Sequence, residues 1–325
     1  EASADLAGRI LATNNPAIAE RIAKEAAGHP LFVEELARHA RDSGTWDLNG
    51  DRPAETPDSD DRRFLLSQVL AERLRKLPAG SQRLLEVVAA AGVPISVTAA
   101  HRAASGGPVD RTTVHRLVAA RLLRTQHTGD VERIAPYHSR IRSTLIEGLS
   151  DSERRELHRT IGHSLADEGA PPRVLLPHFA EAAEAELAAR YAEGAGDDAA
   201  RALAFEEAVQ LYERALEWSD RMAVPPARSS RRSLQRKLAE ALVRAGRCRE
   251  GARLHEALAR EFADPLERSA LELSAAQAYY TSGATREGDR LLAPLGRKLG
   301  LPPASSRLRM NLQTGARLVR LWARG

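Results

Sequence analysis

The chain of 325 residues has a single cysteine, few aromatic residues and no long hydrophobic run. The lone Cys248 excludes an internal disulfide framework and is typical of a reducing compartment, so we expect a cytoplasmic protein. Aromatic residues make up 4% of the chain. Because strands are rich in aromatic and β-branched side chains, this scarcity favours helix packing through Leu, Ala, Val and Ile. No apolar run approaches the roughly 18 residues of a membrane helix, so we expect no membrane partner.

The motifs of common catalytic and metal sites are also missing. The sequence contains no Gly-x-x-x-x-Gly-Lys-Ser/Thr phosphate loop, no Gly-x-Ser-x-Gly elbow and no His-Glu-x-x-His zinc helix. One cysteine cannot build a sulfur-rich zinc site. We therefore expect this chain alone to be no enzyme and to hold no metal and no cofactor.

Lysine is scarce among the cationic residues, since 4 of the 48 are Lys and the others are Arg. The 44 acidic residues nearly balance them and leave a net charge of +4. A balance so near zero does not favour a nucleic-acid binder unless the basic residues gather on one face. Composition alone therefore identifies no partner.

Hydrophobic periodicity predicts a chain built mainly of helices. Residues 1–41 form a first helical unit, in which Gly28 ends one helix and Pro30 begins the next. Residues 42–62 lose this periodicity and combine acidic residues with Gly and Pro, which is typical of a linker.

Residues 63–150 have the pattern of a winged helix, in which helices precede a two-stranded wing. The last of these helices is expected over 112–123, and the hairpin strands over 122–127 and 131–137. Connecting helices then follow over 151–183, with Ser150 or Asp151 as the N-cap of the first.

From residue 184 to residue 325 the predicted helices repeat in pairs. Gly246 and Gly251 recur 37 residues later as Gly283 and Gly288, and an earlier copy places Ala208 43 residues before Gly251. Such spacing resembles tetratricopeptide helix pairs, whose usual period is about 34 residues. A predicted helix over 307–322 has no partner, so we expect the solenoid to continue past residue 325.

The order of these parts resembles a known class of proteins. Residues 22–36, which contain Gly28-His29-Pro30, are similar to the Gly-x-Pro segment in the helical lid of STAND-class signalling ATPases. Residues 137–142 resemble the wing-exit segment of bacterial members, and residues 202–212 their first repeat. The likeness extends to bacterial proteins that join a Ser/Thr protein kinase, an AAA/STAND ATPase and long repeats. LuxR-type regulators of the maltose-regulator kind are related to these.

This resemblance implies a mainly α fold that consists of a helical lid, a winged helix with a small β-hairpin and an α-solenoid of tetratricopeptide-like pairs. It also implies that an ATPase domain binding ATP or ADP with magnesium precedes residue 1. Gly28, Pro30 and His138 would then contact the nucleotide together with that domain. Most members have Asn where this chain has His29, so the hydrogen bonding there differs. From the residues alone, Gly28 and Pro30 are equally explained as a helix stop and restart, and His138 as a packed structural histidine.

Three functions remain open from the sequence. In the first, lid and winged helix control nucleotide-dependent switching and the repeats sense a protein or peptide. In the second, the winged helix binds DNA through Arg111, Arg116, Arg121 and Arg124, although Asp110 would repel phosphate there. In the third, the repeats are a pure protein scaffold. A basic run would recognise an acidic partner, or would merely be a solvated connection between repeats: Arg228, Arg231, Arg232, Arg236 and Lys237.

Overall fold

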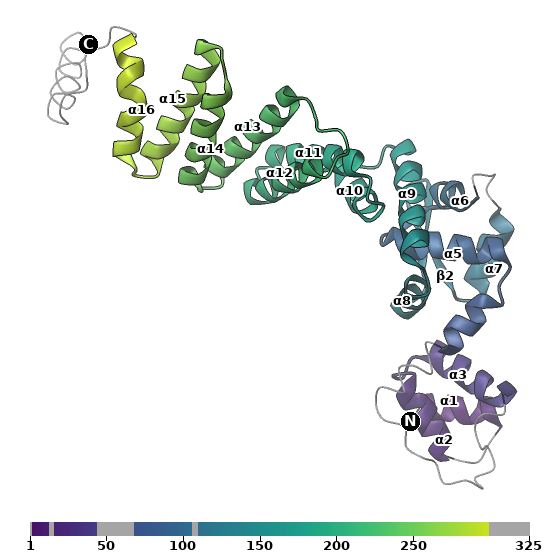
Figure 1. Ribbon diagram of the computed structural model, residues 1–325. Coiled ribbons are helices and arrows are strands. Elements are labelled where there is room, and N and C mark those ends of the chain that lie inside the picture. Colours follow the sequence, from purple (N-terminus) through teal and green to yellow (C-terminus); the bar gives the residue numbers. More distant parts are fainter. Residues whose placement is uncertain (1, 13–15, 44–67, 106–109, 299–325) are drawn as a thin grey trace. The chain divides into compact units, whose positions relative to one another are not determined.

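The computed structural model describes residues 2–12, 16–43, 68–105 and 110–298 (Figure 1). The chain forms two compact units, one of residues 1–170 with 178–183 and the other of residues 171–177 with 184–325. The fold is mainly α with a small β-hairpin, as the sequence predicts. The expected linker lies outside the described residues except for its first two positions, which end a helix, and so does the expected helix over 307–322.

The first unit begins with three helices, α1 (Ala2–Leu11), α2 (Pro16–Glu25) and α3 (Pro30–Ser43). Both α2 and α3 pack against α1, and their apolar faces share one core that also takes in residues of the next helix. The turn between α2 and α3 places Gly28 at φ 73°, where glycine is favoured because it lacks a Cβ. The core residues are Ala7, Leu11, Ile22, Phe32, Val33, Leu36, Val69 and Leu70.

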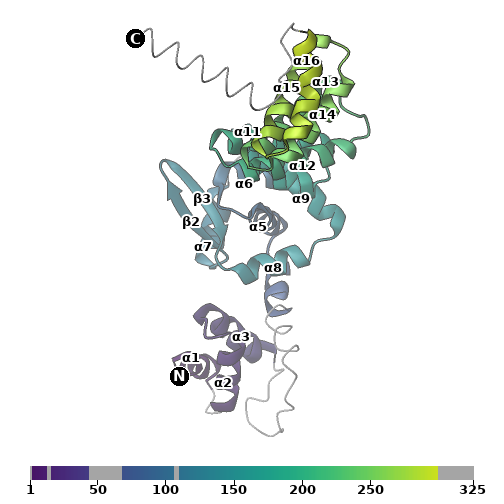
Figure 2. The same ribbon diagram turned by 90° about the vertical axis from the view of Figure 1, so that its left-hand side faces the viewer.

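The next part of this unit combines helices with a three-stranded antiparallel sheet (Figure 2). Residues 68–75 are helical, and α5 (Ala79–Ala91), β1 (Ile95–Ser96), α6 (Val97–Ser105) and α7 (Arg111–Ala119) follow. The hairpin joins β2 (Leu123–Thr128) to β3 (Val131–Pro136), which confirms the predicted hairpin, and β3 also pairs with β1. Strand β1 is only two residues long, too short to leave a pattern in the sequence.

One helix of this part is shorter than predicted. Helix α7 ends at Ala119, whereas the periodicity continues to residue 123. Arg121 takes the left-handed conformation, with φ 54°, and turns the chain, so that Leu123 pairs with Pro136 in the sheet. The apolar stripe continues through this turn because Leu122 and Leu123 are buried like Leu117 before them.

Three helices complete the connection, α8 (Ser139–Glu147), α9 (Asp151–Asp167) and α10 (Pro172–Glu181). Ser150 caps α9 as predicted: its hydroxyl accepts the backbone N–H of Glu153. The Glu153 carboxylate in turn accepts the backbone N–H of Ser150, which completes a capping box. The C-terminal part of α10 packs on α9 through Phe179, which lies so close to Gly162 that an added Cβ would be 2.9 Å from the ring.

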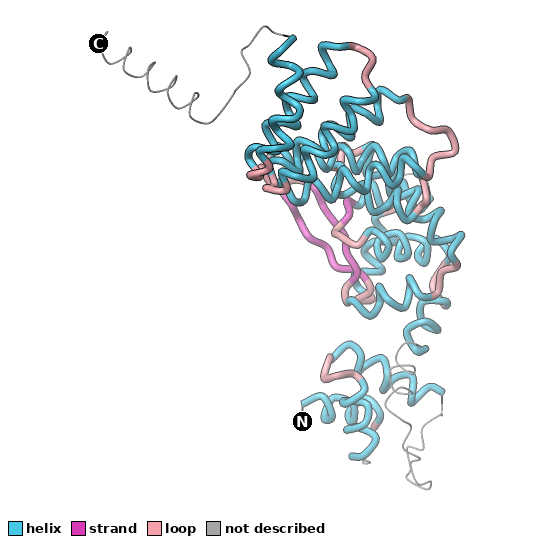
Figure 3. The backbone as a smooth tube through the Cα atoms, turned by 60° about the vertical axis from the view of Figure 1, so that its left-hand side comes forward, coloured by secondary structure: helices cyan, strands magenta, loops and turns pink. Residues whose placement is uncertain are grey.

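The second unit is a stack of antiparallel helix pairs (Figure 3). From its second helix onward, each helix packs against the one before it. Both helices of the third pair begin and end 37 residues after those of the second, which confirms the predicted repeat. The helices are α11 (Ala185–Arg201), α12 (Phe205–Asp220), α13 (Arg228–Arg244), α14 (Cys248–Glu261), α15 (Pro265–Thr281) and α16 (Thr285–Lys298).

Glycine permits the close approach of the two helices within a pair. An added Cβ on Gly251 would lie 2.6 Å from Cγ2 of Val243, and one on Gly288 would lie 2.9 Å from the ring of Tyr280. Val243 and Tyr280 are themselves 37 residues apart, so the same contact is built twice. The recurring glycines are therefore required by helix packing.

Candidate functional site

Two classes of site find no support in the part of the chain that the structure describes. Within it, no group of three or more His, Cys, Asp or Glu side chains is arranged to hold a metal ion. Nor does any helix of the described ranges combine the length and the apolar character needed to cross a bilayer. The candidate site therefore consists of the residues around Gly28, Pro30 and His138.

The Gly-His-Pro segment forms the entry to α3. Gly28 turns the chain, and its carbonyl accepts a hydrogen bond of 3.1 Å from Oγ of Ser3. The carbonyl of His29 accepts the N–H groups of Phe32 and Val33, each at 3.0 Å, so His29 directly precedes the first turn of α3. Pro30 opens that turn, where its missing N–H costs nothing.

The structure brings His138 against this segment. The ring of His138 meets the rings of His29 and Phe32 edge to face, with centroids 4.8 Å and 4.7 Å apart. The rings of His29 and Phe32 are 4.8 Å apart, so the three form one cluster. Segments more than 100 residues apart in sequence thus meet at one place, where His138 lies close to Gly28 and Pro30 through the intervening His29.

His138 also caps α8. Its Nδ1 accepts a hydrogen bond of 3.1 Å from the backbone N–H of Arg140, which requires a neutral ring with the proton on Nε2. Burial lowers the pKa of His138, and the nearby His29 and Arg140 add to this shift. The cap and the electrostatics therefore both favour the neutral imidazole.

Two features beside the ring cluster suit an anionic group. Nδ1 of His29 is buried and has no hydrogen-bond partner among the described residues. A hollow of about 200 Å³ between α5, the sheet and α8 is lined by Arg124, His138 and Arg142, and no carboxylate is among its described lining residues. Positive charge without a paired carboxylate attracts an anion.

Ion pairs also hold α3 to the following part of the unit. Arg73 pairs with the buried Glu35, and it donates a hydrogen bond of 2.9 Å to the carbonyl of Ala120. Arg121 lies 3.6 Å from Glu34. Sequence reasoning missed these contacts, as it missed the roles of His29 and Phe32. The neighbouring Glu34 and Glu35 on a helix rich in apolar residues were the available signal.

The residues proposed to bind DNA are partly engaged within the protein. The carboxylate of Asp110 caps α7 by accepting the N–H groups of Thr112 and Thr113, and negative charge there opposes a phosphate. Arg116 donates to Oγ1 of Thr113 at 3.0 Å, and Arg121 pairs with Glu34.

Four of the five residues of the predicted basic run on α13 have intramolecular carboxylate partners. Lys237 donates to Glu193 and Asp197 at 2.8 Å each, which ties α13 to α11. Arg231 pairs with Asp220, Arg232 with Glu261 and Arg236 with Glu240. Arg228 forms no ion pair with any described residue. The run is therefore unevenly neutralised, and its free positive charge lies at the start of the helix.

Comparison with known proteins finds similarity to a solved structure. No protein-family model matches it, and no curated protein sequence does. The chain is similar to a Signal Transduction ATPase with Numerous Domains (STAND) protein with a tetratricopeptide repeat sensor from Pyrococcus horikoshii. The two share 13% identity with a TM-score of 0.41, over 99% of this chain and 57% of that chain. This chain therefore spans little more than half the length of that structure.

Proposed function

We propose that this chain is the non-catalytic regulatory and protein-interaction region of a bacterial STAND-type signalling ATPase. In it, residues 1–41 would be the lid, residues 63–150 the winged helix and residues 184–325 the sensor repeats. The observation that carries the proposal is the 4.8 Å contact between the rings of His29 and His138. It brings together the two segments that the sequence resemblance implicates in nucleotide binding.

The site fits a role in sensing the nucleotide's phosphates. The buried Nδ1 of His29 lacks a partner among the described residues, and the hollow beside His138 is lined by Arg124 and Arg142. ATP or ADP with magnesium would be held by a preceding domain that carries the phosphate loop. The lid and the winged helix would contact one of the two nucleotides, ATP or ADP, more favourably than the other. That difference in affinity is what shifts a conformational equilibrium.

The remaining features of the proposal follow from the resemblance. The longer protein would be cytoplasmic, would carry a Ser/Thr protein kinase domain and would be related to LuxR-type regulators. The repeats would bind a protein or peptide and thereby bias the same equilibrium.

The first test uses this chain alone. Because the phosphate loop would lie in the preceding domain, calorimetry with magnesium and ATP or ADP should show no saturable binding. Micromolar affinity would contradict the proposal. In the longer protein, His138→Ala and His29→Ala should each change the rate of ADP release, whereas His127→Ala, on an exposed position of β2, should not.

The second test separates regulation from a pure scaffold. Deletion of residues 184–325 from the longer protein should change the rate of nucleotide release if the repeats bias the switch. An unchanged rate would favour the scaffold, in which the repeats bind a partner without acting on the nucleotide.

A further inference from the structure

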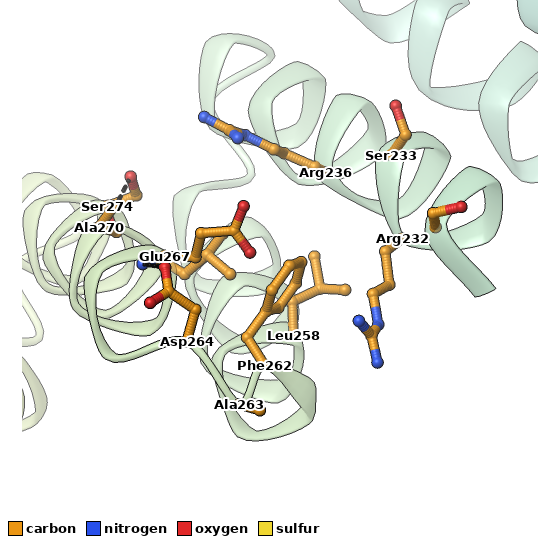
Figure 4. Close-up of a pocket in the computed structure, with 12 residues that line it drawn as sticks. Arg232, Ser233, Arg236, Leu258, Phe262, Ala263, Asp264, Glu267, Ala270 and Ser274 are labelled. Atoms are coloured by element: carbon orange, nitrogen blue, oxygen red, sulfur yellow. Dashed lines mark hydrogen bonds between the residues drawn. The ribbon is translucent and has the colours of Figure 1, made fainter.

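Two neighbouring hollows open on the N-terminal half of α13, and Arg232 lines both of them. The larger, of about 620 Å³, lies between α13, the end of α14 and the start of α15 (Figure 4). The smaller, of about 390 Å³, is lined by Arg228, Arg231, Arg232, Gln235 and Glu261. All of these residues belong to the second unit.

The larger hollow has an apolar floor. Leu258 and Leu271 are 1% and 5% exposed, and the half-buried Phe262 packs with them. Figure 4 shows the Phe262 side chain between Arg232 of α13 and Glu267 of α15. Since removing apolar surface from water is favourable, this floor suits an aliphatic or aromatic side chain of a ligand.

The smaller hollow is cationic. It has three arginines and one glutamate, and Arg228 has no carboxylate partner among the described residues. The guanidinium of Arg232 lies over the ring of Phe262, 4.7 Å from its centroid. It also donates a hydrogen bond of 3.1 Å to the backbone carbonyl of Glu261. The carboxylate partner of Arg231 is exposed, and such a pair contributes little, so the guanidinium can turn to a ligand.

Three of the four arginines that line the two hollows are confined to one copy of the repeat. Shifted by 37 residues, the positions of Arg228, Arg232 and Arg236 are occupied by Pro265, Ser269 and Leu273, whereas Arg231 recurs as Arg268. The glycines that permit helix packing do recur at this spacing. Arg228, Arg232 and Arg236 do not recur, so the helix pair does not require them and they are available for a ligand.

Two carboxylates on the α15 side of the larger hollow determine how a ligand would be oriented. Asp264 caps α15 by accepting the N–H of Glu267 at 3.1 Å, and both carboxylates line the larger hollow but not the smaller one. They repel negative charge from the α15 side. A ligand's acidic part is therefore directed towards Arg228 and Arg231, and its apolar part towards Phe262.

We propose that the two hollows form one binding site for an acidic peptide segment whose carboxylates lie over Arg228, Arg231 and Arg232 and whose neighbouring hydrophobic side chain enters the hollow floored by Leu258, Phe262 and Leu271. This inference rests on the proposed protein-binding role of the repeats and specifies the chemistry of their partner.

The test is fluorescence anisotropy on the whole chain with a labelled synthetic peptide in which a run of Asp precedes Leu-Phe, capped at both ends. Ser233 lines the larger hollow, whereas Ser230, exposed on the same helix, lines neither. Ser233→Glu should weaken binding by about tenfold or more, because it places a negative charge in the site itself, and Ser230→Glu by about twofold at most. Arg228→Ala should also weaken binding, while Arg249→Ala, the same charge change on the exposed side of α14, should not. Replacing Leu-Phe by Ser-Ser in the peptide should reduce affinity at every salt concentration.

Three results would overturn the inference: no binding at millimolar peptide, equal effects of the two Ser→Glu variants, or preference for single-stranded DNA of equal charge. If the peptide fails while nucleotide release by the longer protein still depends on residues 184–325, only this inference is wrong. If nucleotide release is independent of those residues, the proposed function is wrong whether or not the peptide binds.

Discussion

The imidazole of His138 contacts that of His29 edge to face, with ring centroids 4.8 Å apart. The same His138 side chain accepts the N–H of Arg140 and so caps α8. The same ring thus has two roles. It caps the N-terminus of α8, and it packs against His29, the residue that precedes α3. The contact with α3 and the first turn of α8 consequently depend on the same neutral imidazole.

The two tasks of His138 can be separated by substitution. Asn at this position can still accept an N–H as an N-cap but has no ring, whereas Ala loses both functions. We expect His138→Ala to lower the free energy of unfolding by about 1 kcal/mol more than His138→Asn does, because that is the usual contribution of an N-cap. Hydrogen exchange checks the assignment. Amides of the first turn of α8 should exchange faster in the Ala variant, while those of Phe32 and Val33, which bond to the carbonyl of His29, should exchange faster in both.

A second pair of histidines predicts a dependence of stability on pH. Nδ1 of His158 lies 3.0 Å from Nδ1 of His178, and His178 is 3% exposed. Burial, with the neighbouring His158 adding to it, lowers the pKa of His178 to about 4. The pKa of His158 is lowered as well, mainly by burial, although Glu181 opposes this shift.

A pKa below that of the unfolded chain means that the neutral form stabilises the fold. The stabilisation is complete above the unfolded value of about 6.5 and is lost as the pH falls towards 4. Between pH 7.5 and pH 5 we expect His178 to account for a loss of about 2 kcal/mol, measured by chemical denaturation. His178→Gln should reduce this slope, and His163→Gln, an exposed histidine on the same α9 helix as His158, should leave it unchanged. Equal slopes in all three proteins would contradict the assignment.

The sequence predicted the fold better than the site, for a physical reason. Helix periodicity, the hairpin and the 37-residue repeat are local or recurring patterns, and each is read from neighbouring residues. The contact of His138 with His29 joins positions 109 residues apart, and nothing in either segment reveals the other. Charge was equally hard to predict, because Lys237 belongs to an arginine-rich segment in sequence but donates to Glu193 and Asp197 of another helix.

Gly251 provides a test of the close approach within the helix pairs. An added Cβ would lie 2.6 Å from Cγ2 of Val243 and 2.7 Å from the carbonyl oxygen of Ala239, and the latter is backbone that cannot rotate away. We expect Gly251→Ala to destabilise the chain by about 2 kcal/mol, which is typical of overpacking. Gly80, which lies in α5 with nothing within 4 Å of an added Cβ, is the matched control. There the same substitution should stabilise by about 0.5 kcal/mol, because Ala has the higher helix propensity. Thermal denaturation of both variants would decide, and a neutral Gly251→Ala would exclude the tight contact.

Leu203 occupies a backbone conformation that its own side chain disfavours. Its φ is 61°, and it takes the position that Gly246 and Gly283 take in the next two pairs, at φ 85° and 77°. The left-handed region costs a residue with a Cβ about 1–2 kcal/mol. Because Leu203 is 72% exposed, its side chain recovers little of this by burial.

Leu203→Gly should therefore raise the free energy of unfolding by about 0.5–1 kcal/mol, after the greater entropy of glycine in the unfolded chain is subtracted. The reverse change Gly246→Leu should lower it by about 1 kcal/mol, although nothing lies within 4 Å of the new Cβ, so that the cost is conformational and not steric. Destabilisation by Leu203→Gly would mean that the exposed leucine makes contacts whose loss outweighs the relief of its backbone.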